Sequence, residues 1–162
     1  MGSGKTTVGR RLAKKIDFQF IDVDIFIENR YRKTVSEIFS EKGEETFRII
    51  EHKALEELSR FENVVVSTGG GAPCFHNNME LMNKSGLTVY LKVAPEELMK
   101  RLKNGQNKRP LLKGKTSEEM LSFIIENISK RNLYYSQADL ILNADTNNID
   151  QILNNLILLL KK

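Results

Sequence analysis

A lysine flanked by glycines and threonines stands near the start of the chain, in the segment Gly2-Ser3-Gly4-Lys5-Thr6-Thr7. Glycines let backbone N–H groups wrap around phosphate oxygens, the lysine reaches the β- and γ-phosphates, and the threonine hydroxyl can ligate Mg²⁺. Gly4, Lys5 and Thr6 fill the last three positions of the pattern G-x-x-x-x-G-K-[ST], whose first glycine would fall ahead of Met1. The segment therefore predicts a nucleotide phosphate site followed by a helix over 8–16.

The same segment also fits two other interpretations. Met1-Gly2 with Thr6 matches the myristoylation pattern M-G-x-x-x-[ST], and basic residues that could act as a second membrane signal follow it. A glycine-rich helix start without a ligand is the third interpretation. The phosphate site is favoured because the rest of the chain must be explained as well.

Two carboxylates and a run of three glycines follow two apolar stretches. Asp22 and Asp24 come where alternation along a strand would put both side chains on one side. Asp22 is suited to holding Mg²⁺ through water and Asp24 to accepting a proton from a hydroxyl, whereas a turn with a helix cap would need only one of them. Gly69, Gly70 and Gly71 would let a small ligand approach the backbone closely, although a flexible turn also explains them.

Strands and helices are predicted to alternate along the chain. Apolar runs predict strands at 18–23, 64–67, 87–93 and 140–143. Helical patterns are present at about 47–58, 116–134 and 149–160, and a further helix is predicted to start at Pro95. This alternation predicts a single domain over 1–162 with an α/β fold, a three-layer α/β/α sandwich around a central parallel sheet of the P-loop NTPase type. A phosphate loop normally follows a strand, so we expect a strand ahead of Met1 in the working protein.

Composition excludes several classes of protein. Hydrophobic residues make up 40% and charged residues 28% of the 162 residues, which is the balance of an ordered globular chain. One cysteine and two histidines cannot form a disulfide or a structural zinc site, and this predicts a reducing compartment, the cytoplasm. The longest apolar run, 156–160, is far short of a membrane span, and no signal-peptide pattern opens the chain.

The net charge of +4 is concentrated in two segments. Residues 1–15 carry five basic residues and no acid, and residues 100–115 carry seven and no acid. Neither run contains interleaved aromatic residues, and no helix-turn-helix or zinc-finger spacing is present, so nucleic acid is not an expected partner. Basic runs are most often solvated surfaces, and here both are expected to serve ATP.

Five further features in order resemble the shikimate kinases, a family of small P-loop kinases built like nucleoside monophosphate kinases. The resemblance extends from the phosphate segment to about residue 148. It implies transfer of the γ-phosphoryl group of ATP to the 3-hydroxyl of shikimate, which yields shikimate 3-phosphate and ADP on the route to chorismate and the aromatic amino acids. The matching features are Asp22 with Asp24, Gly43-Glu44-Glu45-x-Phe47-Arg48, Gly69 to Gly71, Arg109-Pro110-Leu111-Leu112, and Arg131 in Lys130-Arg131-x-x-x-Tyr135.

The resemblance implies roles for the acceptor side of the site. Arg48 and Arg131 would hold the carboxylate of shikimate, for which the planar guanidinium fork is well matched. Asp24 and the backbone of the triple glycine would bind the hydroxyls, with Asp24 as the base for the attacking one. The helical region of about 24–60 would carry much of this substrate site.

The resemblance also implies the nucleotide side. Lys5 and Arg109 would neutralise charge as the phosphoryl group moves, and a mobile lid over about 104–116 would close over ATP. Thr6 and Asp22 would hold Mg²⁺. The remaining ATP contacts would come from the phosphate segment, including Gly2, Ser3, Gly4 and Thr7, and on the adenine side from Arg101, Thr146 and Asn147.

Two other functions stay open at this point. A related kinase for gluconate or a nucleoside monophosphate is one, because a sugar acid also carries a carboxylate. A nucleotide-binding module without catalysis is the other. The expected partners are therefore ATP and a small acid, with no nucleic acid and no membrane, and the protein is expected to act as a monomer.

Overall fold

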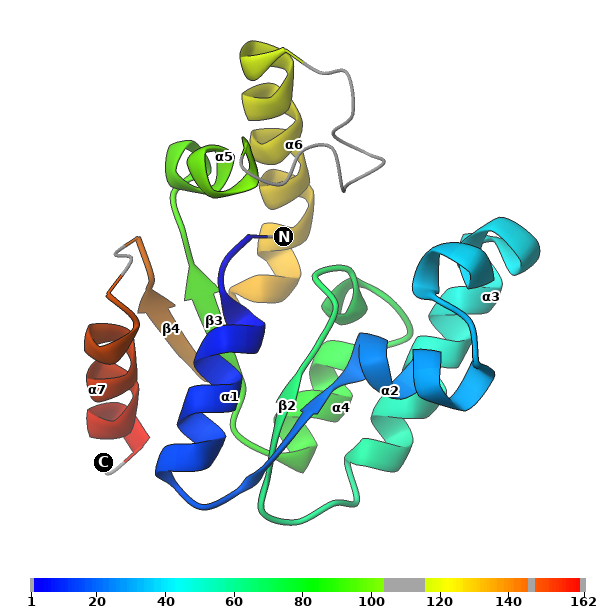
Figure 1. Cartoon of the computed structure of the whole chain (residues 1–162), viewed down its shortest axis with the longest axis horizontal. Coiled ribbons are helices and arrows are strands. Elements are labelled where there is room, and N and C mark those ends of the chain that lie inside the picture. Colours follow the sequence, from blue (N-terminus) through cyan, green and yellow to red (C-terminus); the bar gives the residue numbers. More distant parts are fainter. Residues whose placement is uncertain (1, 104–115, 146–147, 161–162) are drawn as a thin grey trace.

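Helices and strands alternate along the chain in the computed structural model, which describes residues 2–103, 116–145 and 148–160 (Figure 1). The four strands lie close to the predicted positions, and the helix after the phosphate segment begins one turn earlier than predicted. The strands are β1 (Gln19–Asp22), β2 (Val64–Ser67), β3 (Val89–Lys92) and β4 (Leu140–Asn143). The helices are α1 (Lys5–Lys15), α2 (Val23–Tyr31), α3 (Val35–Leu58), the 3₁₀ turn η1 (Ala72–Cys74), α4 (Asn78–Ser85), α5 (Pro95–Lys103), α6 (Ser117–Tyr135) and α7 (Ile149–Leu160).

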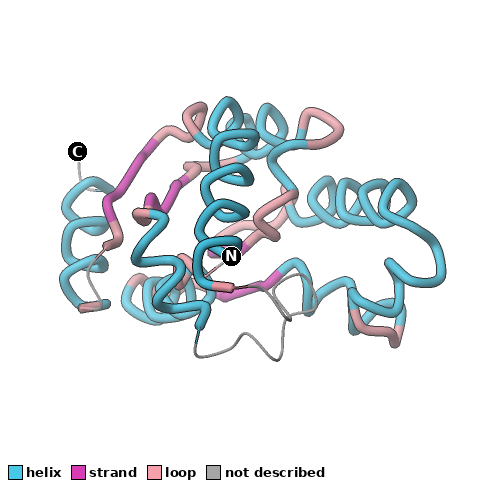
Figure 2. The backbone as a smooth tube through the Cα atoms, turned by 90° about the horizontal axis from the view of Figure 1, so that it is seen from above, coloured by secondary structure: helices cyan, strands magenta, loops and turns pink. Residues whose placement is uncertain are grey.

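The strands form two parallel pairs. In the first pair β1 lies beside β2, in a register that runs from Gln19 opposite Val64 to Asp22 opposite Ser67. In the second pair β3 lies beside β4 in the same way. Within the described residues no ladder joins β2 to β3, so the parallel sheet is present as two halves. Figure 2 shows the two pairs apart, in magenta, with helices around them.

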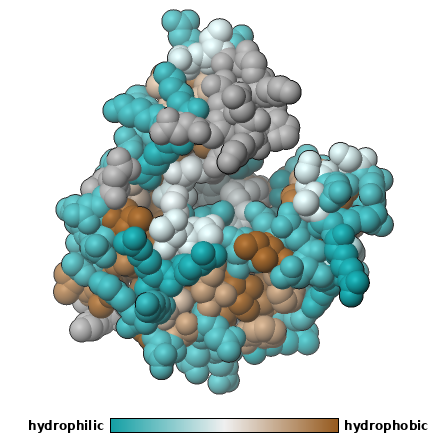
Figure 3. All heavy atoms as spheres, viewed as in Figure 1, coloured by the Kyte–Doolittle hydropathy of each residue, from teal (hydrophilic) through white to brown (hydrophobic). Residues whose placement is uncertain are grey.

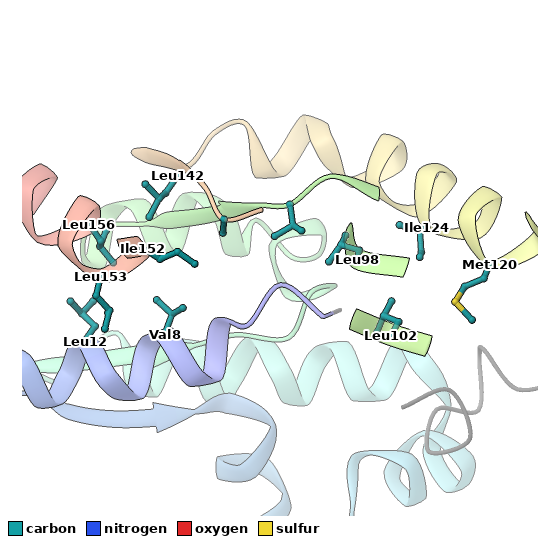
Figure 4. Packing of buried hydrophobic residues seen from close by; sticks show 12 residues of the cluster. Val8, Leu12, Leu98, Leu102, Met120, Ile124, Leu142, Ile152, Leu153 and Leu156 are labelled. Carbon is teal, nitrogen blue, oxygen red and sulfur yellow. The ribbon is translucent and has the colours of Figure 1, made fainter. Parts of the chain in front are cut away.

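Each half of the sheet has its own hydrophobic cluster. The first cluster joins α2, α3 and η1 to one face of β1 and β2, and Phe47 and Leu55 are among its buried residues. The second joins α1, α5, α6 and α7 to β4, as the packing of Val8, Leu12 and Leu153 illustrates (Figure 4). Because α1 also packs on β1 and β2, it bridges the two halves.

Local sequence signals explain where the longest helices begin. Thr34 and Glu37 form a capping box at the start of α3, and Thr116 and Glu119 form another at the start of α6, where the sequence predicted it. Gly43 interrupts α3 with a φ of 77°, a conformation that glycine adopts without steric cost. Among the described helices, none combines the length and the apolar character that crossing a membrane requires.

A cavity of about 260 Å³ lies between the two halves. It is lined mainly by apolar side chains from both inner strands and from α5 and α6, among them Val66, Tyr90, Leu91, Leu98 and Phe123. The inner edges of β2 and β3 have no strand partner within the described residues. An extended strand in this gap would pair with both edges, and the strand expected ahead of Met1 stays a prediction.

We expect an extended apolar peptide to bind in this gap, because unpaired strand edges are templates for a further strand. A β-branched peptide of about six residues, the usual strand length, would be added before thermal unfolding. At about a hundred times its Kd it should stabilise the fold by about 2.7 kcal/mol and raise Tm by several degrees. A peptide with alternate prolines, which lack N–H donors, is the control. Equal Tm values with both peptides would contradict the expectation.

Candidate functional site

The phosphate segment forms a tight turn into the first turn of α1. Gly4 is the N-cap of α1 with a φ of 85°, and its carbonyl accepts the backbone N–H of Val8 at 2.9 Å. The first turn of α1 contains no acidic residue of its own, so no side chain of the helix itself neutralises the positive end of its dipole. Ser3 and Lys5 line the cavity together with Gly69. The predicted anion site therefore has the helix terminus and the lysine that it needs.

The structure brings the two predicted metal ligands together. The hydroxyl of Thr6 in α1 donates a hydrogen bond to Oδ2 of Asp22 at 2.9 Å. Both ligands are hard oxygen groups, which suit Mg²⁺, and this ion usually takes few protein ligands beside phosphates and water. No group of three or more His, Cys, Asp or Glu side chains placed to hold a metal is present in the described part of the chain. The pair fits an ion that is completed by nucleotide phosphates.

Asp22 and Asp24 are related differently from the prediction. Asp22 is the last residue of β1 and the N-cap of α2, and its Oδ1 accepts the backbone N–H of Asp24 at 3.1 Å. Asp24 thus lies in the first turn of a helix, so the expected strand alternation of the two carboxylates is wrong. Asp22 instead caps the helix, as in the alternative interpretation of this segment. A carboxylate that accepts an N–H of the first helical turn stops the strand and starts the helix.

Asp24 is a partly buried carboxyl group among charged neighbours. Burial raises its pKa above the ordinary value, and Asp22 adds to this, while Lys5 and Arg48 act in the opposite direction. Its Oδ1 lies 3.3 Å from where a Cβ on Gly69 would be. The carboxyl group therefore faces the glycine loop between two cations, which is a suitable position for exchanging a proton with a bound ligand.

Arg48 is held in one position by an ion pair and by aromatic rings. Its guanidinium donates to Glu51 at 2.7 Å and to Glu44 at 3.0 Å, and only 11% of its side chain is exposed. It also lies 4.4 Å from the ring centroid of Phe75, with two further phenylalanine rings within 5.7 Å. A cation fixed in this way loses little conformational entropy when it binds an anion.

The glycines at 69 and 71 let the side chains of Arg48 and Glu51 lie close to the backbone of this loop. A Cβ on Gly71 would lie 2.6 Å from Nη2 of Arg48, and a Cβ on Gly69 would lie 2.9 Å from Oε1 of Glu51. The carbonyl of Gly70 accepts a hydrogen bond from the hydroxyl of Tyr135 at 2.5 Å. A side chain at position 69 or 71 would displace the ion pair between Arg48 and Glu51, so packing favours glycine at these two positions.

Arg131 reaches the site from the other half of the molecule. It lies one turn before Tyr135 on α6 and lines the cavity with Lys5 and Gly70. It is close enough to lower the pKa of Tyr135, although burial raises that pKa overall. The two arginines predicted to bind one carboxylate therefore approach the glycine loop from α3 and α6.

The sequence interpretation missed two residues of this cluster, Glu51 and Tyr135. Glu51 is 1% exposed, and burial raises its pKa although Arg48 donates to it. A charged residue three positions after Arg48, within the apolar stripe of α3, was the available signal. Tyr135 was noted only as part of a motif, and its contact with Gly70 joins residues that are 65 positions apart.

The adenine side is described only in part. Arg101 donates to Glu97 at 2.9 Å and to the carbonyls of Ala144 and Asp145 at 2.9 and 3.1 Å. It therefore connects α5 to the loop after β4, where adenine contacts were predicted. Other predicted nucleotide residues lie outside the described residues: Arg109, Thr146, Asn147 and the lid from 104 to 115.

The surface that carries this cluster is hollowed. Figure 3 shows the hollow between the part of the molecule formed by α5 and α6 and the part formed by α2 and α3. Lys5, Gly70 and Arg131 line the cavity between the two halves. Residues of the predicted phosphate site and of the predicted carboxylate site therefore line one cavity.

Comparisons with known proteins point to one family. A family model described as "Shikimate kinase" matches residues 1–161. A shikimate kinase of Parabacteroides distasonis is 56% identical over 145 residues, which are 90% of this chain and 84% of that protein. The crystal structure of shikimate kinase from Bacteroides thetaiotaomicron is similar with a TM-score of 0.95 and 48% identity, covering 100% of this chain and 94% of that one. Shikimate kinase from Acinetobacter baumannii in complex with shikimate gives a TM-score of 0.88 at 32% identity, over 99% and 88% of the two chains. The predicted P-loop kinase fold is confirmed.

Replacing Gly71 with Ala tests the packing of the glycine loop. The new Cβ would force the guanidinium of Arg48 away from Glu51, and overpacking of this kind costs about 1–3 kcal/mol. We expect Tm to fall by several degrees in a thermal scan. Gly86→Ala is the matched control, because nothing lies within 4 Å of a Cβ there and Tm should not fall. Equal Tm values for the two variants would contradict the packing argument.

Proposed function

Because the chain belongs to the shikimate kinase family, we propose that the cluster around Asp24, Arg48 and Arg131 binds shikimate beside the phosphates of ATP. The family reaction transfers the γ-phosphoryl group of ATP to the 3-hydroxyl of shikimate, and the chain is an ATP-dependent phosphotransferase of this kind. One observation carries the residue assignment: a fixed guanidinium and a partly buried carboxyl group meet at the triple glycine, next to the lysine of the phosphate loop.

The acceptor would be held at both ends. Arg48, already fixed by Glu51, would bind one carboxylate oxygen of shikimate, and Arg131 on α6 would bind from the opposite side. The backbone of Gly69 to Gly71 would contact ring hydroxyls, because the three glycines carry no side chains of their own. Holding the ring from two elements would fix the direction of its 3-hydroxyl, and positioning is the largest part of phosphoryl transfer.

Asp24 would take the proton of the attacking hydroxyl. As the hydroxyl oxygen bonds to the γ-phosphorus, the bond from that phosphorus to the bridging oxygen of ADP breaks, and the proton moves to the Asp24 carboxylate. A carboxyl group with a raised pKa is a better proton acceptor than an ordinary aspartate. Lys5, close enough to Asp24 to influence its pKa, would keep enough of the group ionised at neutral pH.

The phosphate loop would bind the nucleotide. Backbone N–H groups of Gly2 to Thr7 and the N-terminus of α1 would contact the phosphates, and Lys5 would follow the γ-phosphoryl group as it moves. Mg²⁺ held by Thr6 and Asp22 would neutralise charge on the phosphates. Arg109 is assigned to the same charge by resemblance, within a lid over 104–116, and Arg101, Thr146 and Asn147 to the adenine side.

The protein would act as a monomer in the cytoplasm. Every residue assigned to the site belongs to one chain, so no second copy is needed to complete it. Light scattering on the purified protein should give the mass of a single chain, and a stable dimer would contradict this part of the proposal.

The acceptor is identified by ADP release in the presence of different small acids. Turnover should require shikimate and Mg²⁺, and removing the ion with EDTA should stop it, since the phosphates would lose their counter-charge. Gluconate and a nucleoside monophosphate are the comparison substrates. Turnover with either of these and none with shikimate would assign the chain to a related kinase, and ATP binding without any turnover would indicate a nucleotide-binding module.

Asp24→Asn tests the proton acceptor. We expect kcat to fall by about 10²-fold or more while the affinity for ATP stays nearly unchanged, because general base catalysis contributes on this scale. Asp17→Asn, at an exposed loop position with positive φ that asparagine tolerates, should leave kcat unchanged. Turnover of Asp24→Asn close to that of the parent protein would make the assignment wrong.

The raised pKa of Asp24 also predicts a pH dependence. In the parent protein kcat/KM should fall as the pH drops through a pKa above the ordinary 3.8, because the protonated carboxyl cannot accept a proton. Stability has the opposite sign: the group favours folding when protonated, and this contribution is lost as the pH rises through the folded-state pKa. Asp24→Asn should therefore unfold at a Tm no lower than the parent at neutral pH. An acid limb of kcat/KM at or below 3.8 would contradict the shift.

A further inference from the structure

The turn that follows the glycine loop, residues 72–75, is held by one buried amide. Asn78, the first residue of α4, is 0% exposed, and its side-chain nitrogen donates a hydrogen bond to the carbonyl of Ala72 at 2.8 Å. Its backbone N–H donates to the carbonyl of Phe75 at 2.9 Å. One residue therefore fixes both ends of this turn, and with them the position from which the Phe75 ring projects.

His52 on α3 binds the other end of the same amide. The nitrogen of the Asn78 side chain faces a carbonyl, so its oxygen is the atom that faces His52. This oxygen, Oδ1, lies 2.6 Å from Nδ1 of the imidazole, which must therefore carry a proton and donate it. Buried polar groups are almost always paired, and here both ends of the amide have a partner. The turn is thus connected to α3 through His52.

The same helix carries the cation that this turn covers. Arg48 lies one helical turn before His52 on α3. Its Cζ lies over the ring of Phe75, 4.4 Å from the centroid. The rings of Phe39 and Phe47 lie farther away, at 5.7 and 5.4 Å. The contacts therefore form a closed path, which leaves α3 at His52 and returns to it at Arg48.

A ring in this position stabilises the cation and limits how it can tilt. The attraction between a cation and an aromatic face is stronger where water is excluded, and only 11% of the Arg48 side chain is exposed. Glu44 and Glu51 accept hydrogen bonds from part of the guanidinium, and the ring of Phe75 covers it from the side of the glycine loop. A carboxylate that binds to the remaining N–H groups would meet a cation whose orientation is already set.

We propose that His52, Asn78 and Phe75 are positioning residues for the acceptor, and that they act by orienting the guanidinium of Arg48. This inference rests on the proposed binding of the acceptor carboxylate by Arg48. A tilted guanidinium would lose part of its planar match to a carboxylate, so the affinity for the acceptor would fall. The phosphate loop is not part of this path, so ATP binding and the transfer step should be unaffected.

Phe75→Leu removes the ring and keeps an apolar side chain. The KM for shikimate should rise about fivefold, the scale of a cation–π contact, while kcat and the KM for ATP stay within about twofold of the parent values. Phe75→Tyr keeps the ring and should retain the parent KM. Phe61→Leu, which removes a ring that is 44% exposed and lies outside this path, is the matched control and should change none of these constants.

His52→Phe keeps a ring on α3 but removes the donor to Asn78. The KM for shikimate should rise about threefold, the scale of one lost hydrogen bond, again with kcat unchanged. His52→Asn, which keeps a donor near the position of Nδ1, should restore the parent KM. Combining His52→Phe with Phe75→Leu should raise KM no further than Phe75→Leu alone, because both would act through the same ring.

The outcomes separate this inference from the proposed function. A parent protein without turnover of shikimate, or an Arg48→Lys variant with the parent KM, would contradict the proposed function itself. A raised KM in Arg48→Lys with the parent KM in Phe75→Leu would overturn the positioning role alone. A lower Tm of His52→Phe with an unchanged KM would also overturn it, since the contact would then serve stability only. If Phe75→Leu does not fold, the two His52 variants decide in the same way.

Discussion

The buried ion pair between Arg48 and Glu51 is the contact on which the acceptor side of the site depends. The pair lies against Gly71 and Gly69, so it sets both the position of the cation and the need for a loop without side chains. A buried pair of this kind is costly to break, because one charge would be left without a partner. In the proposed site, the same contact would therefore contribute both to the position of the cation and to folding stability.

The second requirement is that two halves of the molecule meet at one place. Arg48 and Asp24 belong to the half built on β1 and β2, whereas Arg131 and Tyr135 belong to α6, which packs with the other half. The helix α1 packs against both, and it carries the lysine of the phosphate loop. The proposed nucleotide and acceptor sites would thus be adjacent because one helix bridges the two clusters.

The sequence predicted the local features well and the non-local ones poorly. The start of α6 at Thr116 follows from a capping box, and the strand at 64–67 follows from its β-branched residues, because both signals are contained in a few neighbouring residues. The change from strand to helix at Asp22 was one of two interpretations left open, because a carboxylate at this position can lie within a strand or cap a helix. The role of Glu51 depends on burial and on contacts between elements, which a linear pattern of residues does not give.

The hydrogen bond from Tyr135 to Gly70 joins α6 to the glycine loop. A ligand held by both Arg48 and Arg131 would connect the same two halves. The ligand and this hydrogen bond would then both hold the two halves together. Once one of them is formed, the other would cost less conformational entropy. The free energy of ligand binding would therefore be coupled to the stability of the contact between the two halves. Substitutions at this contact would change the affinity for the ligand without touching it.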